Sequence, residues 1–264
     1  MMPFWELTES QRACRLDRAI HLSQESSGYG IGVQKERTVH SVLKFYLEPD
    51  VDQHEIPIGS FIADIYHHHP QEALEIQSAG FGALRRKLDC FLAEFPVTVI
   101  YPVPWHKWLF WSDPESGEVS SGRRSPKTGE LYWILPELYR IRSYLSHPRL
   151  SFLPVLVDVE EYRLLNGWSR DRKRGSHRMD RIPVQIGPCR LLQTPQDYVE
   201  ILPPLPRPFT SADFQKATRF SPRAASYALL ALRSLGAVIQ CGCEGRAYLY
   251  QTISNPEEET THAI

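Results

Sequence analysis

The sequence places acidic and amide side chains inside short segments that otherwise have the pattern of buried strands. In "FIADIYHHHPQEALEIQ", residues 61–77, Asp64 interrupts an apolar alternation, and Glu75 and Gln77 follow after a turn. Because side chains alternate along a strand, Glu75 and Gln77 share one face, and a tight turn brings Asp64 beside Glu75. Adjacent carboxylates repel unless a cation lies between them, and hard oxygen ligands suit Mg²⁺. The pattern predicts Asp64 and Glu75 as magnesium ligands, with Gln77 orienting a water or a phosphate oxygen.

The same residues also permit a structural interpretation, in which Asp64 ends a strand at a turn and Glu75 faces solvent on an edge strand. Other metal chemistry has less support. Adjacent histidines at 67–69 cannot all ligate one ion comfortably. Cys241 and Cys243 have no second ligand pair, whereas a structural zinc normally takes four ligands. The carboxylate pair is therefore the main candidate for chemistry.

The surrounding segments predict the helices and strands that would position these residues. Residues 32–47 carry apolar side chains at helical spacing, and Glu36 falls on that apolar face, where a carboxylate is out of place unless it faces a polar site. Further elements are expected as strands at 56–65 and 73–78, a helix at 80–92 and a buried strand at 97–103. This order indicates an α/β (α+β) fold in which Glu36 can reach the two carboxylates.

The combination resembles the restriction-endonuclease-like PD-(D/E)XK superfamily. The matching pieces, within residues 32–103, are Glu36, "IADIY" with Asp64, "LEIQ" with Glu75 and Gln77, and the helix that follows. The resemblance implies a mixed sheet flanked by helices, and two acids holding Mg²⁺, which activates water to attack a DNA phosphodiester. Gln77 stands where lysine is usual. A neutral amide cannot stabilise transition-state charge as an ammonium does, so the departure bears on catalysis more than on the fold.

Two segments rich in basic residues predict contacts with phosphate groups. The segment 163–181, interpreted as one loop, has seven basic residues against two acidic ones: Arg163, Arg170, Arg172, Lys173, Arg174, Arg178 and Arg181. A second, turn-rich segment holds Arg123, Arg124 and Lys127. Such clusters neutralise phosphates and bind less tightly as salt rises, although a solvated loop has the same composition. Trp168 and His177 lie among the basic residues and are suited to stacking.

The middle of the chain also resembles an uncharacterised bacterial protein family. The resemblance rests on "VTVIYPVPWHKWLFW", "SPKTGELYWILPELYRI" and "DVEEYRLLNGWSRDRKRGSHRMDRIP". No activity is established for that family. The resemblance therefore implies only a bacterial cytoplasmic setting.

The composition favours a cytoplasmic globular protein. The 264 residues are 42% hydrophobic, with a net charge of −1, which is ordinary for this class. No stretch approaches the roughly 20 apolar residues of a membrane helix, and the first residues lack the basic start and apolar run of a signal peptide. Five cysteines without framework spacing suit a reducing compartment.

Shifts in composition predict two domains. The proline-rich "LPPLPRP" at 202–208 can sustain neither a helix nor a central strand and is interpreted as a linker. A nuclease-like core is expected over 1–201, with a helical segment at about 1–30, and a small domain over 209–253. The polar, acidic tail at 254–264 has little to bury and is expected to be disordered.

The segment 209–253 resembles a winged helix-turn-helix. Thr210 or Ser211 caps a first helix, Ser221 and Pro222 begin a second, and two strands follow around a turn. The resemblance implies that the start of the second helix faces a major groove. The nucleic-acid-binding residues predicted here are Ser221, Arg223, Ser226 and Arg246. Winged helices also serve as protein-docking units.

Together these features predict a Mg²⁺-dependent DNA endonuclease whose catalytic residues are Asp64, Glu75, Gln77 and Glu36. The alternative is a non-catalytic DNA-binding regulator built on a degenerate nuclease fold, and a third candidate is a protein-interaction module. Metal-dependent nicking separates the first two, and salt-sensitive DNA binding separates both from the third. RNA in place of DNA, and a homodimer, stay open.

Overall fold

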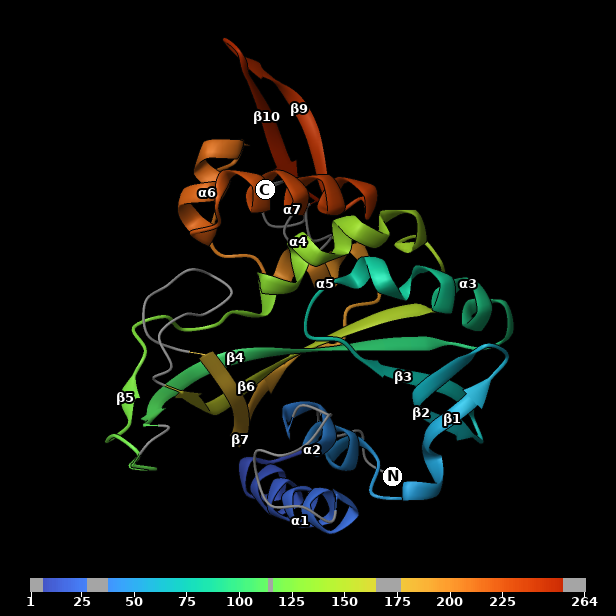
Figure 1. Ribbon diagram of the computed structural model, residues 1–264. Coiled ribbons are helices and arrows are strands. Elements are labelled where there is room, and N and C mark those ends of the chain that lie inside the picture. Colours follow the sequence, from blue (N-terminus) through green and yellow to red (C-terminus); the bar gives the residue numbers. More distant parts are fainter. Residues whose placement is uncertain (1–6, 28–37, 114–115, 165–176, 254–264) are drawn as a thin grey trace.

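A computed structural model describes residues 7–27, 38–113, 116–164 and 177–253. Its centre is a mixed seven-stranded sheet in the order β1-β2-β3-β4-β6-β7, with the short β5 paired to the outer part of β4 (Figure 1). Helices α1 and α2 cover one face, and α3, α4 and α5 cover the other. The α+β class is confirmed. No helix within the described ranges is long and apolar enough to cross a membrane.

The elements have the following bounds. The α-helices are α1 (Glu9–Ser27), α2 (Thr38–Leu47), α3 (Arg85–Glu94), α4 (Leu135–Leu138), α5 (Pro195–Glu200), α6 (Ser211–Thr218) and α7 (Pro222–Ser234). The 3-10 helices are η2 (Val51–Gln53), η3 (Phe81–Leu84), η4 (Leu131–Ile134) and η5 (Tyr139–Tyr144). The main sheet contains β1 (His54–Ile58), β2 (Phe61–His68), β3 (Gln71–Ile76), β4 (Val97–Ser112), β5 (Arg123–Arg124), β6 (Leu150–Leu164) and β7 (His177–Cys189). A second sheet contains β8 (Phe209–Thr210), β9 (Val238–Glu244) and β10 (Ala247–Thr252).

An antiparallel meander and one crossover build the part of the sheet that carries the two acids. β1, β2 and β3 pair antiparallel in succession, and the chain then passes through α3 so that β4 runs parallel to β3. β6 adds parallel to β4, and β7 pairs antiparallel with β6. The inner parts of β4 and β6 are buried on both faces, which explains their near-continuous apolar sequences.

Two hydrophobic clusters hold the helices on the sheet. On one face, Tyr46 of α2 packs in a cluster with Ile65 of β2. On the other, Phe91 of α3 lies in a cluster with Phe81 and Phe152, whose rings stack with centroids 6.2 Å apart. Each such side chain contributes roughly 1.5–3 kcal/mol by leaving water, so the sheet holds a helix firmly on either side of the acids.

The predicted strand at 56–65 is two strands in the structure. β1 ends at Ile58 and β2 begins at Phe61, and the two residues pair across a turn at Gly59. Gly59 has φ +59°, a left-handed conformation that glycine adopts without steric strain. The apolar alternation runs straight through this turn in the sequence, so periodicity alone predicted one strand.

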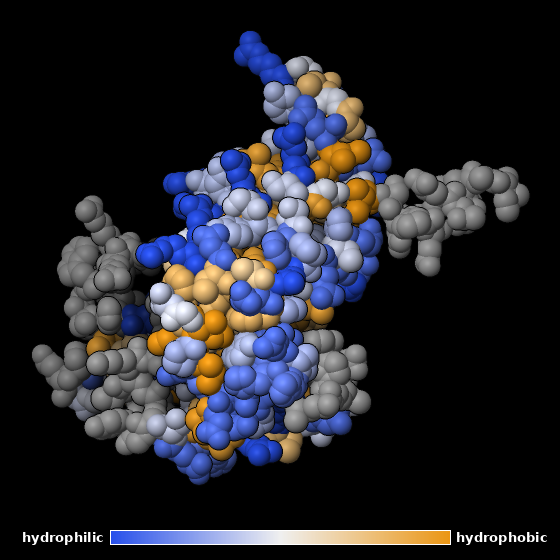
Figure 2. Space-filling model, turned by 90° about the vertical axis from the view of Figure 1, so that its right-hand side faces the viewer, coloured by the Kyte–Doolittle hydropathy of each residue, from blue (hydrophilic) through white to orange (hydrophobic). Residues whose placement is uncertain are grey.

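β1 forms one edge of the main sheet. Pro57 and the charged Glu55 lie on this short strand, and such residues limit pairing with a further strand. Figure 2 views the molecule from this side and shows apolar residues gathered across its middle, between hydrophilic regions. Ile62 of β2 is exposed. The edge thus combines apolar side chains with a backbone that is unsuited to strand addition.

The C-terminal elements follow the predicted order of two helices and a hairpin. Thr210 caps α6 in a capping box with Asp213. Ser221 caps α7, and Pro222 is its first residue. These caps agree with the sequence predictions. The β9–β10 hairpin projects from the molecule, with its tip at the far end from α1 (Figure 1).

The C-terminal elements pack directly on the α/β part. α7 lies against α4, and Tyr227 stacks on Tyr139 of η5, with ring centroids 4.3 Å apart. One hydrophobic cluster extends from Phe91 of α3 through Leu135 of α4 to Leu232 of α7. The division into two domains stays a prediction, and the shared cluster implies that the two parts stabilise each other.

Candidate functional site

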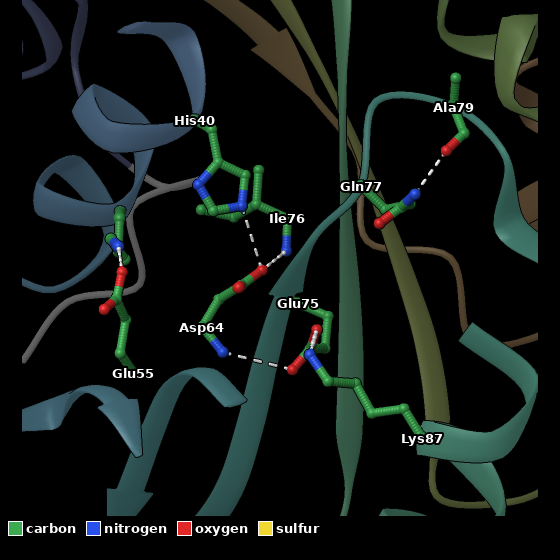
Figure 3. Close-up of polar contacts among 9 residues, drawn as sticks. His40, Glu55, Asp64, Glu75, Ile76, Gln77, Ala79 and Lys87 are labelled. Carbon is green, nitrogen blue, oxygen red and sulfur yellow. Dashed lines mark hydrogen bonds and ion pairs between the residues drawn. The ribbon is translucent and has the colours of Figure 1, made fainter. Parts of the chain in front are cut away.

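The β2–β3 hairpin brings the two predicted carboxylates together. The paired positions run from the turn to Ile65 and Leu74, and the next two residues along the strands are Asp64 and Glu75. Here side chains replace the backbone ladder: the Asp64 N–H donates to Glu75 Oε1 (3.3 Å), and the Ile76 N–H donates to Asp64 Oδ2 (2.8 Å). The two acids therefore hydrogen-bond β2 to β3 at the point where the backbone ladder ends (Figure 3).

Helix α2 holds Asp64 through His40. The His40 Nε2 atom lies 3.2 Å from Asp64 Oδ2. Burial by itself would raise the pKa of Asp64, but the hydrogen bond and charge of His40, the Ile76 N–H and the charge of Lys87 together lower it below its ordinary value. Asp64 is consequently an ionised carboxylate at neutral pH.

Helix α3 holds Glu75 through Lys87. The Glu75 side chain is only 3% exposed, and Lys87 Nζ donates to its Oε2 atom at 2.5 Å. Burial raises the pKa of Glu75, and the charge of Asp64 raises it further, to about 7, despite the opposing charge of Lys87. Burial and the charge of Asp64 therefore disfavour the ionised form of Glu75 by more than Lys87 favours it.

Neither Lys87 nor His40 belongs to the motif that predicted the acids. Lys87 lies three residues after Leu84 and four before Phe91, both buried, so it borders the apolar stripe of the helix predicted at 80–92. A charged residue beside an apolar helical stripe is the signal that could have found it. The same signal singled out Glu36 in the sequence.

The other two predicted catalytic residues are not part of the described cluster. The Gln77 amide donates to the Ala79 carbonyl and is turned away from both acids (Figure 3). The cause is local, because β3 ends at Ile76 and the chain then bends toward η3. Glu36 lies outside the residues that the structure describes.

The acid pair matches the donor set that Mg²⁺ takes. This ion binds through one or two carboxylates and keeps several waters, so it needs no third protein ligand. Within the described part of the chain, no group of three or more histidine, cysteine, aspartate or glutamate side chains is arranged to hold a metal ion. Burial, and after it the charge of Asp64, raises the pKa of Glu75, and a divalent cation beside the two acids would favour the ionised form of Glu75. Asp64 and Glu75 are therefore the described residues that could hold such a cation.

The histidine run at 67–69 contributes an ion-pair bridge. His67 Nδ1 lies 2.8 Å from Glu72 Oε1, and Nε2 lies 3.0 Å from Glu48 Oε2. The hydrogen bond that His67 donates to Glu72 raises the pKa of His67, burial lowers it, and the charges of Glu72 and Glu48 raise it further. Its two nitrogens bind different carboxylates, so His67 ties the end of α2 to the β2–β3 hairpin.

The basic segment 163–181 is not one loop. Arg163 lies in β6, and Arg178 and Arg181 lie in β7, because the long β6 strand extends to Leu164 and pairs with β7 up to that residue. The remaining predicted residues of this segment lie outside the described residues: Arg170, Arg172, Lys173 and Arg174, with Trp168 among them. In the second segment, Arg123 and Arg124 form β5, and Lys127 follows; all three are exposed.

The predicted groove-reading residues of the C-terminal part have local partners. Ser221 Oγ accepts from the Ala224 N–H as the cap of α7, and Ser226 Oγ donates to the Pro222 carbonyl. Arg223 Nε donates to Tyr227 Oη at 2.9 Å and remains exposed. Arg246 is exposed at the tip of the hairpin. The two arginines are thus better placed than the two serines to meet a phosphate.

Comparison with known proteins identifies a family but no activity. The family model described as "Domain of unknown function (DUF8091)" matches residues 37–193. An uncharacterized protein of Treponema pallidum (strain Nichols) is 28% identical over 224 residues, which cover 84% of this chain and 87% of the relative. No solved structure matches. The family match agrees with the predicted resemblance of the middle segment to an uncharacterised family.

Proposed function

The chain belongs to the DUF8091 family, and we propose that it is a Mg²⁺-dependent nuclease that hydrolyses DNA phosphodiesters at the Asp64–Glu75 pair. The observation that carries this proposal is the meeting of Asp64, Glu75 and Lys87 from β2, β3 and α3. Two acids to hold a cation and an ammonium to stabilise phosphate charge are the groups that this reaction uses.

The order of elements supports the proposal. The helix α2, the strand with Asp64, the strand with Glu75 and the helix α3 follow each other as the resemblance to the PD-(D/E)XK superfamily implies. Gln77 occupies the motif position where lysine is usual, and Lys87 brings an ammonium to Glu75 from α3 instead. The amide at Gln77 is therefore no argument against catalysis.

Each residue has a separate role in this proposal. Asp64 and Glu75 would hold the cation, which when bound supplies a water of lowered pKa and positive charge beside the phosphate. The Lys87 ammonium lies next to Glu75 Oε2, where it can donate to a phosphate oxygen and stabilise the charge that develops there. His40 fixes the orientation of Asp64 through Oδ2.

The Lys87–Glu75 ion pair also favours a second candidate function. An ammonium at 2.5 Å from a buried carboxylate partly neutralises the acid pair without any cation. A chain that has lost hydrolysis would keep this part of the fold and act as a non-catalytic DNA-binding regulator. Both functions require salt-sensitive DNA binding, and only the first requires nicking.

A plasmid-nicking assay with Glu75→Gln tests the proposal. The variant keeps the size of the side chain and removes the negative charge of one cation ligand, so nicking in Mg²⁺ is expected to fall to background. Glu94→Gln is the matched control, because Glu94 is exposed at the end of α3. Nicking by Glu75→Gln at the rate of the parent would overturn the assignment. A parent that binds DNA and never nicks it would favour the regulator.

A further inference from the structure

The outer half of the main sheet has two chemically different faces. β4 and β6 extend past α1 and α2 toward β5 (Figure 1), and Asp180 of β7 accepts hydrogen bonds from Thr38 at the start of α2. Residues opposite each other on neighbouring strands share a face. Leu109 stands opposite both Arg123 of β5 and Glu161 of β6, and Glu161 stands opposite Arg181 of β7. The register therefore assigns each side chain of this region to one face or the other.

One of these faces, called the basic face here, carries five basic residues and one acidic residue. It consists of Lys107, Leu109, Trp111, Arg123, Glu161, Arg163, Arg178 and Arg181. The opposite face contains Trp108, Phe110, Arg124, Glu160, Tyr162 and Asp180. The rings of Phe110 and Tyr162 stack there, with centroids 5.0 Å apart, and this stacking requires that the two side chains lie on the same face. Positive charge is thus confined almost entirely to the basic face.

Buried Glu161 organises the basic face. Its side chain is 1% exposed, with Oε1 accepting from Arg163 Nε and Oε2 accepting from Arg181 Nε, each at 2.7 Å. Burial would raise the pKa of Glu161, but the charges and hydrogen bonds of Arg181 and Arg163 lower it. One carboxylate therefore holds two guanidinium groups side by side, each about 30% exposed.

We propose that the basic face binds the phosphate backbone of a nucleic-acid strand and that Glu161 positions Arg163 and Arg181 for this contact. The inference deepens the proposed function and rests on it for the identity of the substrate. Guanidinium groups suit phosphate because their planar fork donates two parallel hydrogen bonds. Trp111 stands opposite Arg163 and is half-buried, so it can stack on a base beside a bound phosphate.

Two adjacent arginines provide a matched test. Arg123 and Arg124 are both exposed in β5, and the register places Arg123 on the basic face and Arg124 on the other. Arg123→Gln is expected to weaken binding of a labelled DNA duplex and to reduce the slope of log affinity against log salt by about 0.9, the value of one lost phosphate contact. The sequence alone predicted Arg124 as a phosphate contact too, but the register places it on the other face, so Arg124→Gln is expected to bind as the parent does. Equal effects from the two variants would overturn the assignment of the basic face.

Glu161→Gln tests the positioning role, because charge counting and positioning predict opposite results. Removal of an acidic group makes the face more positive, so charge alone predicts tighter DNA binding. Loss of positioning predicts several-fold weaker binding, and tighter binding would contradict it. If Glu161→Gln fails to fold, Arg181→Gln replaces it and is expected to weaken binding more than Arg124→Gln does. Polyglutamate at the same concentration of charge is expected not to displace bound DNA. Displacement by polyglutamate would show that the face binds polyanions in general, and would contradict the proposal.

Binding in EDTA keeps this inference separate from the proposed function. Without a divalent cation the acid pair contributes no hydrolysis, so affinity and its salt dependence report on binding alone, and the difference between Arg123→Gln and the parent reports on the basic face. Normal DNA binding by Arg123→Gln with intact nicking by the parent would reject the basic face and keep the nuclease. Weak binding by Arg123→Gln with no nicking by the parent would reject the nuclease and keep the basic face.

Discussion

Lys87 Nζ lies 2.5 Å from Glu75 Oε2, so an ammonium from α3 meets a carboxylate from β3 that is almost completely buried. This contact joins an element from one side of the sheet to the strand pair that carries both acids. It also places positive charge beside the candidate cation site, while the motif residue Gln77 bonds to Ala79. The chemistry proposed for the site depends on this relationship.

Lys87→Met is expected to lower the rate of Mg²⁺-dependent nicking by about 10²–10³, the usual effect of removing one donor that stabilises transition-state charge. Binding of Mg²⁺ should be retained or tighter, because the ammonium that competes for Glu75 is gone. Calorimetry and nicking on the same preparation measure both. Lys216→Met is the control, since Lys216 is exposed on α6. A Lys87→Met variant that nicks like the control would show that Lys87 is structural only.

Gln77→Lys in the Lys87→Met background tests whether an ammonium can act from the motif position. The Gln77 side chain is half-buried and lies one residue beyond the end of β3, where its amide bonds to Ala79. A lysine there has to turn back toward Glu75, and the double variant tests whether its longer side chain does so. Partial recovery of nicking is expected in the double variant. In the parent background Gln77→Lys should change the rate little, because Lys87 already provides the charge. If Lys87→Met abolishes nicking and the double variant does not recover it, the ammonium must come from α3 and cannot be supplied from position 77.

The pairing of the two acids was predictable because it depends on the local sequence pattern. Their partners were not predictable from that pattern. Period-two alternation and a tight turn suffice to place Asp64 beside Glu75. The identity of Lys87 and His40 as partners depends on how α3 and α2 rest on the sheet, which is a tertiary property. Gln77 shares the strand parity of Glu75, but β3 ends one residue earlier, and parity then no longer fixes a side chain's direction.

The basic segments show the same limit. Their charge was plain in the sequence, and their arrangement was not. Arg123 and Arg124 are neighbours that face opposite ways because β5 pairs with β4, and this pairing is not visible from composition. Glu161 counts as an ordinary acid in the sequence, although in the fold it anchors Arg163 and Arg181 from a buried position.

The pKa of Glu75 predicts how stability changes with pH. Its folded-state value of about 7 exceeds the ordinary 4.5, so the folded protein binds more protons between these values, and the free energy of unfolding falls as pH rises through this window. The lowered pKa of Asp64 acts at more acidic pH, outside the window. In EDTA the free energy of unfolding of the parent should fall between pH 5 and pH 8 by about 1–3 kcal/mol more than that of Glu75→Gln. This range is discounted for the coupling of Glu75 to Asp64.

Denaturant unfolding at the two pH values measures this difference. Addition of Mg²⁺ at pH 8 is expected to restore most of the lost stability in the parent and none in Glu75→Gln, because a cation that binds only the folded state stabilises it. A parent whose stability relative to Glu75→Gln is the same at both pH values would contradict the raised pKa of the buried Glu75.

The hydrophobic cluster shared by α4 and α7 predicts that the chain unfolds as one unit. Leu232 of α7 and Leu135 of α4 are fully buried in this cluster. Leu232→Ala is expected to lower the free energy of unfolding by about 2–5 kcal/mol, and a chain that ends at residue 206 should lose its cooperative transition. Scanning calorimetry that resolves two transitions, with only the smaller one shifted by Leu232→Ala, would instead support two independent domains.

The central claim is that Asp64 and Glu75 act as a cation site, and Asp64→Asn tests it most directly. An asparagine oxygen can still accept from the Ile76 N–H, so this hydrogen bond between β2 and β3 remains while one charge is removed. Asp52→Asn makes the same change at an exposed position in η2 and serves as the control. Nicking, DNA affinity in EDTA and melting temperature are measured on both variants. The cation-site account predicts no nicking by Asp64→Asn and DNA affinity equal to or above that of the parent. The melting temperature is expected to fall, because the lowered pKa of Asp64 means that its ionised form stabilises the folded state. A destabilised Asp64→Asn variant that still nicks DNA at the parent's rate would contradict the cation-site account.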